Sequence, residues 1–123
     1  LMMARMDSRL IIQVIINIVD NAIKYTPPGS TILLSAHKDK GYVVVEIADN
    51  GAGIADEAKK RLFDMFFTAS KTVADSRRSL GLGLALCKSI ISAHGGTISV
   101  EDNRPHGAIF RFTLLAEEVP IHE

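Results

Sequence analysis

The feature that most constrains this chain is a stripe of polar side chains along an otherwise apolar helix. Gln13, Asn17, Asn21 and Lys24 recur at helical spacing in the apolar region 10–24. At about 100° per residue, these four side chains fall within about 80° of one another. A core helix does not bury such a stripe without a reason. Two amide oxygens one turn apart and an ammonium one turn further suit a magnesium ion and the phosphates it carries, because hard cations prefer oxygen ligands.

Length and composition exclude several classes of protein. The 123 residues correspond to one domain, which can bury roughly two thirds of its unfolded surface. Because 14 acidic residues balance 14 basic ones, nothing indicates a nucleic-acid partner. Cys87 is the single cysteine, so no disulfide can form within the chain. It lies in an apolar stretch and is expected in the core. No apolar run approaches the roughly 18 to 20 residues of a membrane-spanning helix.

Periodicity and punctuation predict the order of the elements. A helix begins at Asp7 or Ser8, runs to Tyr25 and is ended by the Thr26-Pro27-Pro28-Gly29 segment. Alternating runs at 31–38 and 42–48 form a hairpin, a short helix follows near 56–62, and the glycines at 81 and 83 open a helix that ends near Ala93. Two strands close the chain, near 97–101 and 108–115.

This order predicts an α+β two-layer sandwich, with a mixed β-sheet covered on one face by three helices. The chain starts at Leu1, and residues 1–6 have the pattern of a strand end with nothing before it to pair with. We therefore expect a single domain over 1–123 that is part of a longer protein.

Asp49 is the second candidate site residue. It shares a strand face with Val43, Val45 and Ile47, because side chains alternate along a strand. A carboxylate on the buried face needs donors, and an exocyclic amine is a good one. The alternative is that Asp49 caps its own turn, as Asp often does in such loops. The residues alone leave both possibilities open.

Two glycine pairs follow Asp49 along the chain. Gly51 and Gly53 allow backbone to approach a flat ligand closely, or simply supply positive φ in a turn. Gly81 and Gly83 precede a strong helix, whose N–H groups and dipole favour phosphate. The spacing matches neither GxxxxGK[ST] nor GxGxxG. Between the pairs, the polar stretch 68–79 has no periodicity and is typical of a functional loop.

Four motifs together resemble one family. N17-I-V-D-N-A-I-K-Y25 resembles the N-box of the sensor histidine kinases, and D49-N-G-A-G-I54 resembles their first glycine box. L62-F-D-M-F-F67 and G81-L-G-L-A-L86 resemble the aromatic box and the second glycine box. The resemblance covers nearly the whole chain and implies the Bergerat sandwich of gyrase, Hsp90 and MutL ATPase domains. The stretches ADSRR and EDNRPHGAIFRFTL are most similar to the potassium-responsive Kdp branch.

The resemblance also implies a role for each matching residue. Asn17 and Asn21 hold magnesium, Lys24 meets phosphate, Tyr25 packs against the adenine, and Asp49 accepts a hydrogen bond from the adenine amine. Gly51, Gly53 and Ile54 line the base pocket, Gly81, Leu82 and Gly83 present backbone to the phosphates, and Lys71, Arg77 and Arg78 reach the γ-phosphate from the lid. The implied catalytic set is Asn17, Lys24, Arg77 and Arg78.

The chain departs from the family pattern at three places. Ser79 stands where glycine is usual ahead of Leu80, Met65 replaces a common proline, and Phe67-Thr68 stands where an aromatic-arginine pair is usual. The role of that arginine falls to Arg77 or Arg78, or is missing. A catalytically silent nucleotide-binding module therefore stays open, as does an ATPase that gates a conformational change.

The activity implied is transfer of the ATP γ-phosphate to a histidine of a dimerisation domain, and onward to a response regulator. None of the four histidines here resembles that acceptor, which would precede residue 1. We therefore expect the fragment to bind ATP and Mg²⁺ without phosphorylating itself. The resemblance further implies a cytoplasmic domain of a membrane-anchored homodimer in the bacterial inner or plasma membrane.

Overall fold

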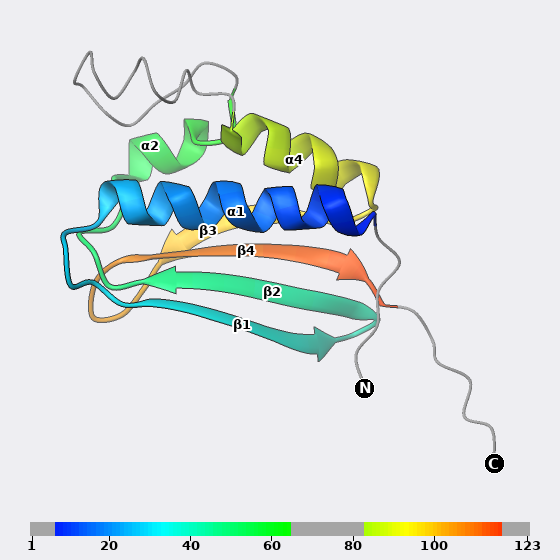
Figure 1. The fold of residues 1–123 in the computed structure, drawn as a ribbon, viewed down its shortest axis with the longest axis horizontal. Helices are drawn as coiled ribbons and strands as arrows, with labels where there is room; N and C mark the ends of the chain where they lie inside the picture. Colours follow the sequence, from blue (N-terminus) through cyan, green and yellow to red (C-terminus); the bar gives the residue numbers. More distant parts are fainter. Residues whose placement is uncertain (1–6, 65–82, 117–123) are drawn as a thin grey trace.

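A four-stranded sheet with three helices on one face makes up the described part of the molecule (Figure 1). The structure is a computed structural model and describes residues 7–64 and 83–116. The α+β two-layer architecture predicted from the sequence is confirmed. In chain order the elements are α1 (Ser8–Tyr25), β1 (Ile32–Asp39), β2 (Tyr42–Asp49), α2 (Asp56–Arg61), α4 (Gly83–Ala93), β3 (Ile98–Asp102) and β4 (Ala108–Leu115).

The sheet has the strand order β1-β2-β4-β3, and every pair among these strands is antiparallel. The mixed pairing expected from the sequence does not occur among the four described strands. Short turns make β1–β2 and β3–β4 hairpins, which must be antiparallel. The two hairpins join where β4 pairs with β2, with Phe110 opposite Ile47. The predicted strand end at residues 1–6 lies outside the described residues.

Local signals define the ends of α1. Asp7 Oδ1 accepts from the backbone N–H groups of Arg9 and Leu10, at 3.1 and 3.4 Å, and so caps the first turn. At the other end the Thr26 hydroxyl donates to the Ala22 carbonyl at 2.7 Å. Thr26 itself is extended, as a residue before proline prefers to be. The predicted bounds of this helix are confirmed.

The last turn of α4 ends in two glycines, as the sequence predicted. Gly95 has φ 74°, and its N–H donates to the Ser92 carbonyl at 3.0 Å. The Gly96 N–H donates to the Ile91 carbonyl at 3.0 Å, which completes a Schellman motif. His94 then links the two long helices, because its Nδ1 donates to the Ile90 carbonyl and its Nε2 accepts from the Asp7 N–H.

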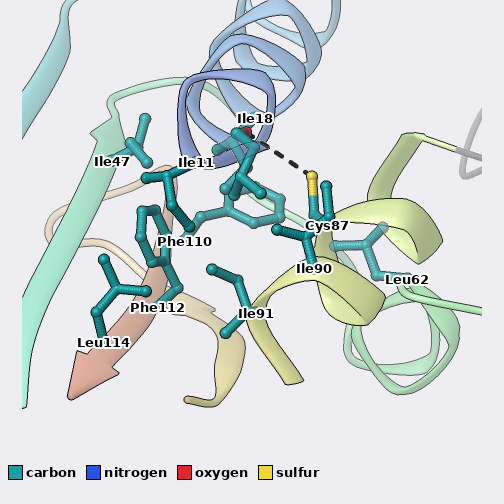
Figure 2. Close-up of a cluster of buried hydrophobic side chains, with 11 residues drawn as sticks. Ile11, Ile18, Ile47, Leu62, Cys87, Ile90, Ile91, Phe110, Phe112 and Leu114 are labelled. Atoms are coloured by element: carbon teal, nitrogen blue, oxygen red, sulfur yellow. Dashed lines mark hydrogen bonds between the residues drawn. The ribbon is translucent and has the colours of Figure 1, made fainter. Parts of the chain in front are cut away.

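The core lies between the sheet and the helices. Its most deeply buried side chains include Ile18 from α1, Ile91 from α4, and Phe110 and Phe112 from β4 (Figure 2). Cys87 is among them, as predicted, and its thiol donates to the Val14 carbonyl across a sulfur-to-oxygen distance of 3.7 Å. Burial raises the pKa of Cys87 to about 11, against a smaller opposing effect of a hydrogen bond with Asn17.

Candidate functional site

Asp49 is the last residue of β2 and its side chain is buried, with 7% exposure. The carboxylate accepts two backbone hydrogen bonds, from Gly51 N at 2.9 Å and from Ala108 N at 3.2 Å. Asp49 therefore does cap its own turn, as one of the two sequence hypotheses held. Both bonds end on Oδ1, however. Oδ2 accepts neither bond. Among the described residues no fully buried side-chain nitrogen or oxygen lacks a hydrogen-bond partner, so Oδ2 is not fully buried and is available to an outside donor.

The first glycine motif is packed against the C-terminal end of α1. A Cβ on Gly51 would lie 2.6 Å from the Thr26 side chain, a distance that real Cβ atoms essentially never show, so Thr26 or the turn would have to shift. Gly53 has φ +84°, a conformation that favours glycine. The Asn50 side chain accepts from Thr31 N at 2.8 Å and ties this turn to the start of β1. The positive φ considered for this pair is therefore present at Gly53, whereas Gly51 is held close to Thr26, and an approach of either glycine to a flat ligand stays a prediction.

The polar stripe on α1 points toward the start of α4. Asn17, Asn21 and Lys24 are half-buried, whereas Gln13 is exposed. Gln13 Nε2 donates to Asn17 Oδ1 at 2.9 Å, and Asn17 Nδ2 donates to the Gly83 carbonyl at 3.5 Å. The stripe and the described end of the second glycine motif thus lie side by side.

One helix therefore connects the two glycine motifs. Asn17 contacts Gly83 at the start of α4, and Thr26 contacts Gly51 next to Asp49. Nine residues separate these points, which corresponds to about 13 Å along the helix axis. The Asp49 turn and the N-terminus of α4 are consequently held at different points along the same helix, the first at its C-terminal end and the second beside Asn17.

The amide groups of the stripe fit a magnesium ion. Asn17 Oδ1 accepts one hydrogen bond, which leaves a second lone pair, and the Asn21 amide makes none with a described residue. Hard cations prefer such oxygens. The described residues contain no group of three or more His, Cys, Asp or Glu that could hold a metal.

The other predicted site residues have different outcomes. Ile54, in the turn after Asp49, is partly buried and packs against the core. Gly83 begins α4 with open space around it. The Tyr25 backbone belongs to α1, but its side chain is not described. Lys71, Arg77, Arg78, Gly81 and Leu82 lie outside the described residues, as do the departures at Met65, Phe67, Thr68 and Ser79.

Sequence reasoning missed the turn between β3 and β4. Asn103 Nδ2 donates to the Asp49 carbonyl at 2.7 Å, and His106 Nδ1 donates to the Gly51 carbonyl at 3.0 Å. These residues are 54 and 55 positions away from their partners. The run Asn-Arg-Pro-His-Gly reads as an ordinary turn, so the sequence held no signal for these contacts.

This geometry agrees with the comparison to known proteins. Residues 6–118 match the family model described as histidine kinase-, DNA gyrase B- and HSP90-like ATPase. The chain belongs to this ATPase family. Membership implies ATP binding, and it places the residues of the stripe and of Asp49 in an ATP-binding domain.

Individual relatives are sensor histidine kinases. The chain is 50% identical over 115 residues to the sensor protein KdpD of Clostridium acetobutylicum, covering 94% of the chain and 13% of that protein. The catalytic domain of the histidine kinase ThkA has a TM-score of 0.78 at 34% identity, covering 91% of this chain and 70% of that one. The structure of ThkA in complex with the response regulator TrrA has a TM-score of 0.67 at 34% identity, and the match covers 85% of this chain and 28% of that one.

The similarity to KdpD agrees with the resemblance to the Kdp branch. The chain spans only a small part of that relative's length. None of the helices in the described ranges is long and apolar enough to cross a membrane.

Proposed function

We propose that this domain binds Mg-ATP and, in its parent protein, supplies the γ-phosphate to a histidine of a dimerisation domain. The observation that carries the proposal is the buried Asp49 carboxylate, which uses one oxygen for two backbone bonds and leaves the other for an outside amine. A base held there lies at one end of the α1 stripe. Its phosphates then extend toward the N-terminus of α4, where helix N–H groups favour anions.

Phosphoryl transfer asks a protein mainly for positioning and charge neutralisation. Asn17 and Asn21 would hold the magnesium ion, which when bound offsets phosphate charge. Lys24, in the last turn of α1, adds a cation on the same stripe. Lys71, Arg77 and Arg78 are proposed to reach the γ-phosphate, while Gly81, Leu82 and Gly83 present backbone to the phosphates. Tyr25 is proposed to pack against the adenine, with Gly51, Gly53 and Ile54 beside it.

The parent is proposed to be a longer, membrane-anchored homodimer of the Kdp type, with this domain in the cytoplasm. The small share of KdpD that the chain covers supports a longer parent. The complex of ThkA with a response regulator supports a regulator as the downstream partner. The phosphoacceptor histidine would belong to the dimerisation domain, so this domain alone would transfer no phosphate.

A gating ATPase of the same family is the second candidate function. A glutamate base in the N-box helix would favour it, but α1 contains no glutamate, and its single carboxylate, Asp20, is exposed. The third candidate, a silent binding module, rests on Ser79 and the altered aromatic box, which lie outside the described residues. The observations therefore favour the kinase.

Mixing this domain with the purified dimerisation domain and labelled ATP tests the proposal. Acid-labile phosphate on the dimerisation domain supports a histidine kinase. Release of free phosphate without labelling supports the gating ATPase, and neither product supports the binding module. A dimerisation domain whose acceptor histidine is replaced by glutamine is the matched control, and it should remain unlabelled.

A further inference from the structure

The turn that joins β3 to β4 and the first residue of β4 together hold Asp49 from two sides. Asn103 Nδ2 donates to the Asp49 backbone carbonyl, and the N–H of Ala108 donates to Asp49 Oδ1. The β2–β4 ladder has its last pair at Ala48 and Ile109, so Asp49 lies just beyond it. These two bonds therefore take the place of the β2–β4 ladder at the residue whose carboxylate is proposed to accept from the base.

The same turn also holds the glycine motif that follows Asp49. His106 Nδ1 lies 3.0 Å from the Gly51 carbonyl. That carbonyl can only accept, so Nδ1 carries the proton in this contact. A Cβ on Gly53 would lie 3.2 Å from the Gly107 carbonyl, so the two backbones are in direct contact. A Cβ on Gly107 would overlap the Asp49 carbonyl.

We propose that Asn103 and His106 are positioning residues of the base subsite, which hold Asp49 and Gly51 so that Asp49 Oδ2 faces the exocyclic amine of adenine. This inference rests on the proposed nucleotide site and adds to it a turn that none of the four motifs contains. Neither residue needs to touch the nucleotide. Their effect is on the base alone, and so is independent of magnesium and of the γ-phosphate.

The test is calorimetric titration with ADP in EDTA, and with inosine diphosphate, which carries a carbonyl in place of the amine. Asn103→Ala and His106→Ala each remove one donor, and a neutral hydrogen bond corresponds to about a threefold to tenfold loss of ADP affinity. The affinity for inosine diphosphate should fall less than the affinity for ADP, so the ratio of the two affinities should decrease. His106→Asn places an amide N–H near the position of Nδ1 and should restore affinity to within about twofold of the unmodified chain.

Two controls separate positioning from general destabilisation. Arg104→Gln changes the same turn, but its side chain makes no hydrogen bond to Asp49 or Gly51 among the described contacts. Ile91→Val lowers stability from the core, by about 0.5 to 1.5 kcal/mol in comparable cases. Both controls should bind ADP as the unmodified chain does.

Unchanged ADP affinity in both alanine variants would overturn the inference. So would a loss of ADP affinity in Ile91→Val equal to the loss in the alanine variants. His106→Ala alters an exposed turn, so it keeps the test valid should Asn103→Ala fail to fold. Failure of the proposed function has a different signature. In that case the unmodified chain itself would show no saturable response to ADP.

Discussion

Replacing Asp49 by asparagine tests the central feature of the site with little change in shape. The amide oxygen of the new side chain can still accept from Gly51 N and Ala108 N, as Oδ1 does now. The amide nitrogen then occupies the position of Oδ2. A donor would face the adenine amine, which is also a donor, and the charged acceptor would be gone.

The loss of a hydrogen bond to a charged group sets the magnitude. We expect Asp49→Asn to weaken nucleotide binding by about 1 to 3 kcal/mol, or about fivefold to 150-fold. Titration calorimetry with ADP and with Mg-ATP measures the change, which should be equal for the two ligands. Thermal unfolding should stay close to that of the unmodified chain, because the internal bonds are kept.

Asp49→Ala is the informative comparison. It removes the acceptor of two buried backbone N–H groups, and an unsatisfied buried group costs about 1 to 3 kcal/mol. The alanine variant should therefore lose both stability and nucleotide affinity, whereas Asp49→Asn should lose nucleotide affinity alone. Unchanged ADP affinity in Asp49→Asn would refute the assignment of Asp49 to the adenine amine.

Three further changes test other parts of the molecule. Asn21→Ala should weaken ATP binding mainly when magnesium is present, and an equal loss in EDTA would remove Asn21 from the coordination shell. The pKa of Cys87, raised by burial from 9.0 to about 11, should contribute about 2 to 3 kcal/mol of stability below pH 9 that is lost as the pH rises toward 11. In urea titrations, the free energy of unfolding of Cys87→Ala should not show this decrease with pH. Gly96→Ala should destabilise by about 1 to 3 kcal/mol, because its Cβ would overlap the Thr113 carbonyl. Gly83→Ala, which has open space, should not lower the urea midpoint.

Short-range signals in the sequence were sufficient for the elements and for much of the site. Asp7 and the proline after Thr26 define α1, and the glycines at 95 and 96 end α4, through contacts within a few residues of each helix end. The polar stripe on α1 was visible because helical periodicity is local. The family motifs then indicated which ligand the stripe serves.

Only the tertiary structure decided how these parts meet. It placed β4 beside β2, made all the described pairs antiparallel, and brought Asn103 and His106 onto the Asp49 turn. It also decided which oxygen of Asp49 is used internally and which is left for a ligand. Periodicity and capping report only on near neighbours along the chain. The contacts of β2 with β4, and those of Asn103 and His106 with the Asp49 turn, join residues more than 50 positions apart, and packing of the whole sheet selects their partners.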